Sequence, residues 1–380
     1  MKLFHLADLH LGKSLYERDL VEDQRHALDA VVDAARREKP AIVVLAGDVF
    51  DRAVPSAEAV TLLGRFVADL KAIDDRLIVA MIPGNHDSAA RLAYLAPVLA
   101  TAGVYVACDP AECDQPVVVR RDGETARLWL LPFLAPGAFS RAAPPASESV
   151  SGAAAPSMIT DPPVPARKPK TSQGELFGDG APDGGLSLSD GGLSPWGGAE
   201  VVGGQSPSDG GQSPRGGVEV DEGLSLRSQA DLFAEAMRRI QAAMERPPAE
   251  PAGAAAVTGS DAGGGAAEGG RPMDVLVCHA FAAGGASSES ERAFLGTAEL
   301  VDASAFDRFD YVALGHLHRP QPVGARGRYP GSILAYSFSE GGCEHGFLSV
   351  RLSSQATEAD FRAVRPLRRM IRVEGTFDQV

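Results

Sequence analysis

The stretch YVALGHLHRPQ (residues 311–321) places two histidines, His316 and His318, one residue apart at the end of an apolar run. The chain has only eight histidines, so two of them at one strand end need an explanation. In an extended segment residues i and i+2 point to the same side, so both rings can reach a single centre. The pair indicates either metal ligands or two histidines packed in a core.

Four other apolar runs end in the same way. Residues 2–6, 41–46, 77–82 and 274–278 read as strands, and polar side chains follow each run at once. These side chains are, in chain order, Asp8, His10, Asp48, Asp51, Asn85, His86, Asp87 and His279. The carboxyl ends of strands and the loops after them are where α/β sheets bind ligands. One Asp or His at a strand end is usually a cap or a satisfied core group, but five such ends favour a common metal site.

The rest of the pattern alternates helix with strand. Helical stretches are expected at about 20–38, 56–72 and 88–101; the first ends before Pro40, and Ser56 is placed to cap the second. Such alternation predicts an α/β domain with a sheet buried between helices. Further β-like segments occur at 126–131, 333–338 and 346–351. They indicate more strands than a single parallel sheet needs.

Residues 141–270 have a different composition. They carry 24 of the 42 glycines and 14 of the 27 prolines of the chain, with near-repeats such as DGGLS. We expect most of this insertion to be disordered, because it cannot bury enough apolar surface to offset chain entropy. Residues 225–246 are the exception, since their apolar side chains recur at helical spacing before prolines 247–248 and predict a docked amphipathic helix.

Charge and cysteine content narrow the class of protein. The net charge of −14 argues against a broad basic surface for nucleic acid, although bound divalent cations would reverse the charge locally. The four cysteines show neither paired metal spacing nor a disulfide framework, which suits a reducing compartment. The start lacks the layout of a signal peptide, and no run of 18 apolar residues occurs. We therefore expect a cytoplasmic protein that does not bind a membrane.

Seven of the strand-end residues are candidate metal ligands, and two metals fit them better than one. The candidates are Asp8, His10, Asp48, Asn85, His279, His316 and His318. Oxygen and imidazole donors without cysteine suit hard or borderline divalent ions, and seven are too many for one ion that also holds water. A carboxylate of the second segment could bridge two ions, as in two-metal phosphoryl hydrolysis.

Taken together, the motifs D-x-H, G-D-x-x-D, G-N-H-D and G-H-x-H resemble those of the calcineurin-like metallophosphoesterases. HLADLHLGKSLY, AGDVFDRAVPS, IPGNHDS and YPGSILAYSFSE are similar to the SbcD-type members, the nuclease subunits of bacterial SbcCD complexes. The resemblance covers roughly 1–135 and 272–375. It implies two mixed β-sheets sandwiched between helices (α/β/β/α).

The resemblance also implies a role for each site residue. Asp8, His10 and His318 would hold one metal, Asn85, His279 and His316 the other, and Asp48 would bridge them. His86 would be catalytic rather than a ligand, facing the scissile phosphate and assisting the leaving group. The Asp51 carboxylate would orient the His86 ring and favour its proton-donating form.

Domain boundaries follow from the same comparison of motifs. The phosphoesterase domain would comprise 1–140 and 271–365, interrupted by the insertion at 141–270. Residues 366–380 would begin a truncated capping domain.

The activity implied is that of a DNA repair and recombination nuclease, both a 3′-5′ double-strand exonuclease and a single-strand and hairpin endonuclease. Manganese would be the working metal, with magnesium, iron(II) and zinc as alternatives. The implied partners are DNA, an SbcC-type ATPase subunit and a second copy of the chain, as a homodimer within a heterotetramer. Two other interpretations stay open: a phosphodiesterase of small substrates, and a non-catalytic metal-bound scaffold for an ATPase.

Overall fold

The computed structural model describes residues 1–139, 228–246, 271–282, 300–353 and 356–371. They belong to one compact unit built around two six-stranded sheets. The expected insertion at 141–270 lies outside the described residues except for one helix, α5 (Gln229–Met244), which confirms the helix predicted at 225–246. No helix in the described ranges is long and apolar enough to cross a membrane.

The first sheet has the order β14-β13-β1-β4-β5-β6. Its parallel part comprises β1 (Lys2–Leu6), β4 (Ile42–Ala46), β5 (Ile78–Ile82) and β6 (Val104–Val106). On its other side, β1 pairs antiparallel with β13 (Gly346–Arg351), and β13 pairs antiparallel with β14 (Glu358–Ala363).

The second sheet has the order β11-β12-β10-β9-β8-β7. It contains β7 (Val117–Arg121), β8 (Glu124–Leu131), β9 (Met273–His279), β10 (Tyr311–Gly315), β11 (Gln321–Val323) and β12 (Gly327–Tyr329). Strands β8, β9, β10 and β12 are parallel, and β7 and β11 are antiparallel. Both sheets are therefore mixed, as predicted.

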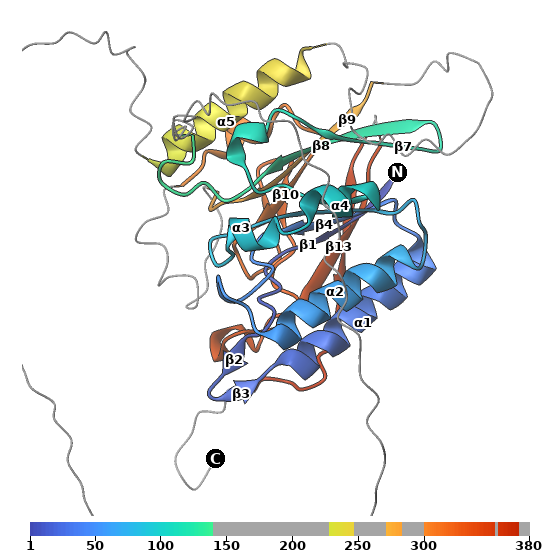
Figure 1. The fold of residues 1–380 in the computed structure, drawn as a ribbon, viewed down its shortest axis with the longest axis vertical. Helices are drawn as coiled ribbons and strands as arrows, with labels where there is room; N and C mark the ends of the chain where they lie inside the picture. Colours follow the sequence, from blue (N-terminus) through green and yellow to red (C-terminus); the bar gives the residue numbers. More distant parts are fainter. Residues whose placement is uncertain (140–227, 247–270, 283–299, 354–355, 372–380) are drawn as a thin grey trace, which may run out of the picture. The chain divides into compact units, whose positions relative to one another are not determined.

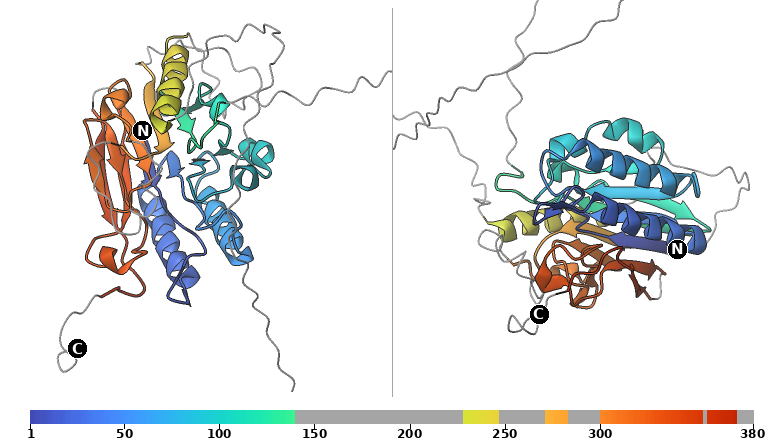
Figure 2. Two further views of the ribbon diagram at one scale, coloured as in Figure 1. Left: turned by 90° about the vertical axis from the view of Figure 1, so that its left-hand side faces the viewer. Right: turned by 90° about the horizontal axis from the view of Figure 1, so that it is seen from below.

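Three apolar layers hold the fold together. Between the sheets, residues such as Val44, Ala80, Val277 and Ala313 form a core to which both sheets contribute. The outer face of the first sheet packs against α1 (Val21–Glu38) and α2 (Ala57–Lys71), and that of the second packs against α5. Figure 1 and Figure 2 show α5 and the α1–α2 pair on opposite sides of the sheets. The α/β/β/α arrangement is therefore confirmed.

The local signals that start and stop the helices act as predicted in two cases. Ser56 caps α2, because its hydroxyl oxygen accepts a hydrogen bond from the Ala59 amide at 3.2 Å. Helix α1 ends before Pro40, with Lys39 in the left-handed conformation at φ 49°.

Two predicted elements were wrong. The helix expected at 88–101 is two short ones, α3 (Ala89–Leu92) and α4 (Ala96–Thr101), because Leu95 adopts a left-handed φ of 63° between them. Residues 333–338 form no strand, and the segment ends in a 3₁₀ turn, η3 (Phe338–Glu340). There the Tyr336 amide donates to the Glu340 carboxylate at 2.8 Å, so a side chain replaces a strand partner.

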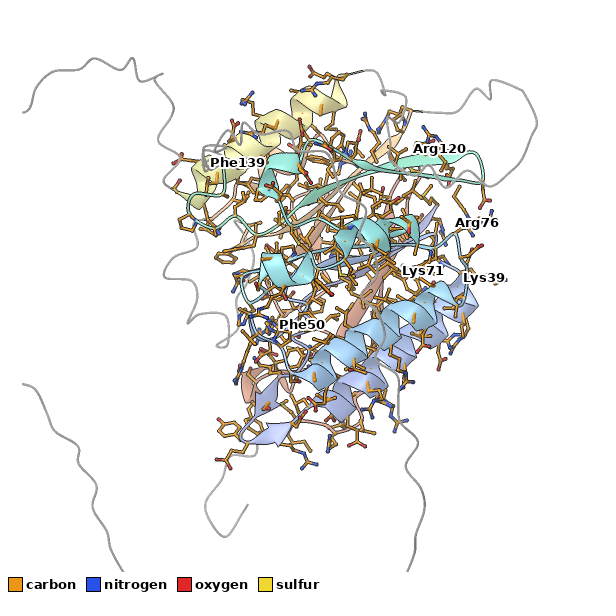
Figure 3. The ribbon with its side chains drawn as sticks, in the orientation of Figure 1. Lys39, Phe50, Lys71, Arg76, Arg120 and Phe139 are labelled. Carbon is orange, nitrogen blue, oxygen red and sulfur yellow. The ribbon has the colours of Figure 1, made fainter. Side chains whose placement is uncertain are left out.

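The parallel strands of both sheets end on the same side. Figure 3 shows Phe50, four residues after β4, on the side of the molecule opposite Lys71, Arg76 and Arg120. The ends of β4, β5 and β9 meet there at one rim, since His279 at the end of β9 lies 2.9 Å from the Ala46 carbonyl oxygen and 3.0 Å from Asn85 Oδ1.

Candidate metal centre and active site

Every predicted site residue lies at this rim. Asp8 and His10 follow β1, Asp48 and Asp51 follow β4, and Asn85 and His86 follow β5. His279 ends β9, while His316 and His318 follow β10. Among the seven candidate ligands only Asn85 is half-buried, and the other six side chains are buried. The His86 side chain is 18% exposed, which makes it the histidine of the cluster that faces solvent most.

The backbone bends sharply to bring these side chains together. Asp8, His10, Asp48 and His316 all have positive φ, at 52°, 42°, 47° and 110°. Such conformations cost free energy for residues other than glycine and persist only where surrounding contacts impose them.

Close packing between strand tips explains the glycines beside the ligands. A Cβ at Gly84 would lie 2.2 Å from Asp48 Oδ1, and one at Gly315 would lie 1.8 Å from the Ala46 carbonyl oxygen. Glycine is therefore required at both positions because a side chain would clash with a neighbouring strand end, and not because of an unusual backbone conformation.

The donor atoms converge in two overlapping halves. In the first, Asp8, His10 and His318 offer ligand atoms within 4.8 Å of one another, and the two Nε2 atoms of the histidines are 3.1 Å apart. In the second, Asn85 Oδ1 lies 3.0 Å from His279 Nε2 and 3.2 Å from His316 Nδ1. The structure thus brings together the residues of each of the two sets that the family resemblance implies.

Asp48 lies between the halves. Its Oδ2 is 3.7 Å from His10 Nε2 and 3.5 Å from His279 Nε2. Its other oxygen, Oδ1, accepts a hydrogen bond from the main-chain amide of His86 at 2.9 Å. One carboxylate therefore faces both halves while the backbone fixes its orientation, which is what a bridging ligand requires.

Neighbouring groups fix the orientation of two histidine rings. His279 Nδ1 lies 2.9 Å from the Ala46 carbonyl oxygen, so Nδ1 carries a proton and Nε2 is left to coordinate. His318 Nδ1 lies 3.1 Å from the carboxylate of the fully buried Glu340. Metal-binding histidines usually have such a partner on the second ring nitrogen.

Burial and neighbouring charges shift the pKa values within the cluster in both directions. Burial raises the pKa of Asp8 to about 7 and lowers the pKa of His316 to about 3. Burial also opposes a charge on His279, but the Asp48 carboxylate outweighs it and raises the pKa of that ring to about 9. In return, although burial opposes ionisation of Asp48, His279 lowers the pKa of its carboxyl well below the usual range. Buried carboxylates that draw protons onto their neighbours are the electrostatic setting that bound cations stabilise.

The residues present therefore fit divalent metals. The donor atoms that converge are carboxylate or amide oxygens and imidazole nitrogens, the ligands that hard and borderline divalent ions prefer. His86 also forms a compact group with His10 and Asp48, so its assignment as a non-ligand rests on the motif resemblance.

His86 is oriented by Asp51, but not in the way predicted. Its Nδ1 lies 3.0 Å from the main-chain carbonyl oxygen of Asp51. The Asp51 carboxylate instead accepts a hydrogen bond from Lys13 Nζ at 2.6 Å and lies 3.6 Å from His10 Nδ1. The backbone of residue 51 thus takes the orienting role expected of its side chain.

Two residues beside the site, Glu340 and Lys13, are missing from the sequence motifs, and a third, Asp87, belongs to a motif but was given no role. The Asp87 carboxylate accepts the amides of Val49, Phe50 and Gly84 at 2.8–3.0 Å and so ties the loop after β4 to the loop after β5. Burial and the nearby Asp48 raise the pKa of Asp87 to about 6. The position of Asp87 in G-N-H-D was the only sequence signal for this contact.

Comparison with known proteins agrees with the geometry. Residues 1–132 match the family model described as calcineurin-like phosphoesterase. The chain is also similar to the SbcD component of the nuclease SbcCD from Staphylococcus saprophyticus, with 25% identity over 380 residues that cover the whole of this chain and 73% of that protein.

The match ends at residue 132, within the second sheet, and β9 and β10, which carry His279 and lead to His316 and His318, come later in the chain. The motifs, the two-sheet fold and the histidine–aspartate cluster all agree with the matched family. The chain is therefore similar over residues 1–132 to the calcineurin-like phosphoesterases, and this similarity points to a metal-dependent phosphoesterase.

Proposed function

We propose that this protein is a DNA nuclease with a dinuclear metal centre, acting as a 3′-5′ exonuclease on duplexes and as an endonuclease on single strands and hairpins. The observation that carries the proposal is the convergence of seven donor side chains from five strand ends beside the partly exposed His86. The similarity to a nuclease component over the whole chain supports DNA as the substrate.

The proposed ligand sets are Asp8, His10 and His318 for one ion and Asn85, His279 and His316 for the other, with Asp48 shared. Bound there, divalent ions would polarise a phosphodiester and lower the pKa of a coordinated water. Manganese is the proposed ion, and the donor set also accommodates magnesium, iron(II) or zinc.

The side chains of the protein prepare the site for this chemistry. Ala46 and Glu340 hold the rings of His279 and His318 in fixed orientations. The strained turns at Asp8, His10 and Asp48 keep the donors in place before a substrate arrives.

His86 is proposed to act on the leaving group. The Asp51 carbonyl oxygen accepts a hydrogen bond from Nδ1–H, which leaves Nε2 to face the cluster, 4.0 Å from Asp48 Oδ2. A protonated imidazole there can donate its Nε2 proton to the departing ester oxygen.

The proposed partners are an SbcC-type ATPase and a second copy of this chain. One feature of the described surface suits a homodimer. Large apolar side chains are exposed in the loop before α2, on α2, in the turn between α3 and α4, and on α4: Val54 (66% exposed), Val60 (50%), Tyr94 (76%), Leu95 (49%) and Val98 (61%). Large apolar side chains left exposed on neighbouring segments of the chain are a feature of protein–protein interfaces.

The test is manganese-dependent cleavage of end-labelled DNA, offered as duplex, single strand and hairpin, with bis-p-nitrophenyl phosphate as the small substrate. His86→Ala should abolish turnover while both metals stay bound. His26→Ala is the matched control, because His26 lies on α1 away from the cluster and contacts the Arg365 carbonyl oxygen.

Three other outcomes are informative. Hydrolysis of only the small diester would leave the catalytic centre correct and DNA as the wrong substrate for this chain alone. Undiminished cleavage by His86→Ala would remove that residue from the chemistry. Metal binding with no cleavage of any substrate would favour the non-catalytic scaffold.

A further inference from the structure

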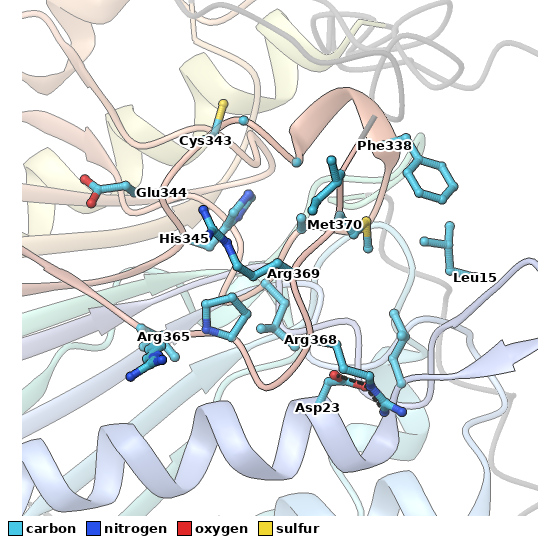
Figure 4. Close-up of a pocket in the computed structure, with 18 of the residues that line it drawn as sticks. Leu15, Asp23, Phe338, Cys343, Glu344, His345, Arg365, Arg368, Arg369 and Met370 are labelled. Atoms are coloured by element: carbon cyan, nitrogen blue, oxygen red, sulfur yellow. Dashed lines mark hydrogen bonds and ion pairs between the residues drawn. The ribbon is translucent and has the colours of Figure 1, made fainter. Parts of the chain in front are cut away.

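A groove with a volume of about 1020 Å³ opens beside the metal cluster. Its walls are the hairpin of β2 (Ser14–Leu15) and β3 (Arg18–Asp19), the turn η3 and residues 363–371. Figure 4 shows Leu15, Phe338 and Met370 on one side of the groove, with Arg365, Arg368 and Arg369 nearby. None of these residues belongs to the proposed metal centre.

Two aromatic rings stand exposed at the rim of the groove. Tyr16 is 81% exposed and Phe338 is 43% exposed, and their ring centroids are 5.4 Å apart with the planes tilted by 44°. They come from segments more than 300 residues apart in the chain. Exposed aromatic faces of this kind are stacking platforms for nucleobases in single strands.

The groove is basic although the chain as a whole carries a net charge of −14. Four arginines line it, Arg18, Arg365, Arg368 and Arg369, against two carboxylates, Asp23 and Glu344. Arg368 neutralises the buried Asp23 through both of its carboxylate oxygens. The other three guanidinium groups are exposed and have no carboxylate partner among the described residues, so they are available for phosphates.

Two segments of the chain contribute to both the groove and the proposed active site. The segment that supplies His10 and Lys13 to the site continues directly into Leu15 and Tyr16. The segment that forms one side of the groove at Leu334 and Phe338 also carries Tyr336, whose ring centroid lies 5.4 Å from that of His10. The groove therefore lies close to the proposed metal centre.

We propose that this groove binds a single strand of DNA next to the scissile phosphate, with bases stacked on Tyr16 and Phe338 and phosphates held by Arg18, Arg365 and Arg369. The inference rests on the proposed nuclease function and adds a strand-binding site to it. Stacking and phosphate contacts are independent of sequence, so the groove recognises single-strandedness rather than a motif.

The test is fluorescence anisotropy with labelled dT12, using the full chain with manganese bound and the His86→Ala substitution so that the strand is not cut. Adding Tyr16→Ala should weaken binding about tenfold or more. A matched abasic strand of the same charge should bind the two proteins equally, because it has no bases to stack.

The phosphate contacts are tested by the double variant Arg365→Ala/Arg369→Ala. It should bind both strands more weakly, and the slope of log affinity against log salt should fall by about 1.4, at about 0.7 per phosphate contact in single strands. Arg120→Ala/Arg326→Ala is the control, since Arg120 lies at the opposite end of the sheets (Figure 3) and Arg326 in the β11–β12 turn.

The proposal is overturned if the groove variants bind dT12 like their parent, or if the control pair weakens binding as much as the groove pair does. Its failure can be told from failure of the proposed function, because binding is measured without cleavage. If the unmodified chain cleaves DNA but the groove variants bind it as well as their parent, only the proposed strand-binding role of the groove is overturned. If the groove variants bind DNA more weakly but the unmodified chain does not cleave it, only the proposed nuclease function is overturned.

Discussion

Glu340 Oε1 lies 3.1 Å from Nδ1 of His318, and both side chains are buried. The other carboxylate oxygen of Glu340 accepts the Tyr336 amide at 2.8 Å, so the whole group is fixed. A buried carboxylate behind a histidine holds the ring in one tautomer and increases its basicity toward a metal. Residues 333–338, which were expected to be a strand, thus lead into a turn at 336–340 that supports the proposed metal centre.

Removing the charge of Glu340 should weaken metal binding. We expect Glu340→Gln to lower manganese affinity by about 10- to 100-fold, because His318 loses its anionic partner while the side-chain volume is kept. The measurement is isothermal titration of the metal-stripped protein. Glu344→Gln, at an exposed position nearby, should bind manganese normally. Equal affinities for the Glu340 variant and the unmodified protein would mean that His318 needs no such partner.

Lys13 should matter for turnover through Asp51. Its ammonium donates to the Asp51 carboxylate at 2.6 Å, and the carbonyl oxygen of the same residue orients His86. We expect Lys13→Met to lower kcat on bis-p-nitrophenyl phosphate by about 10- to 100-fold, since a small displacement of a proton donor is costly.

Bound metal, measured by atomic absorption, should be unchanged in Lys13→Met, because Lys13 is not a proposed ligand. Lys13→Arg should recover part of the lost kcat by keeping the cation. Lys39→Met, at the end of α1, serves as the control. An unchanged kcat in Lys13→Met would show that Asp51 holds its position without the ammonium group.

Much of the site could be predicted because its ligands follow a rule of sheet geometry. Strand ends can be recognised from apolar runs such as 41–46 and 310–314, and polar residues after several of them imply a common rim. The separation into two ligand sets needed the family resemblance as well. Spacing alone places His316 and His318 on the same side but does not assign them to different metals.

The supporting residues could not be predicted in the same way. Glu340 follows no strand, and its contact with His318 depends on the turn formed by residues 336–340. The Asp51 carboxylate was expected to orient the His86 ring, but it accepts a hydrogen bond from Lys13, and the Asp51 carbonyl oxygen contacts the ring instead. Whether a backbone or a side-chain oxygen faces a ring is decided by loop conformation, which no local sequence pattern specifies.

The stability of the fold should depend on pH through Glu38. Its carboxylate joins β1, β13 and β14 to α1 by accepting hydrogen bonds from Lys2, Ser349 and Arg362 at 2.9–3.1 Å. Partial burial opposes the charge, but the hydrogen bonds from Arg362, Ser349 and Lys2 outweigh it and lower the pKa of Glu38 to about 2.

A carboxylate with a depressed pKa stabilises the fold above its unfolded-state pKa, which is 4.5 for Glu38, and loses that effect as pH falls through about 2. Glu38→Gln should therefore lower the free energy of unfolding by about 1 kcal/mol at pH 7, and the difference should shrink below pH 4.5. Urea titrations across this range measure it. Glu358→Gln removes an exposed pair with Arg351 and should show little effect at any pH; a similar loss in both variants would contradict the argument.

Two glycines should respond in opposite ways to the same substitution. A Cβ at Gly84 would lie 2.2 Å from Asp48 Oδ1 and 2.4 Å from the Asp48 amide nitrogen, whereas a Cβ at Gly64, inside α2, would have no atom within 4 Å. We expect Gly84→Ala to displace Asp48 and to abolish metal binding together with activity. Gly64→Ala should raise the free energy of unfolding by about 0.5–1 kcal/mol, because alanine is a better helix former than glycine. Metal titration and thermal unfolding of both variants are the measurements, and normal metal binding by Gly84→Ala would show that Asp48 does not hold the two halves of the cluster together.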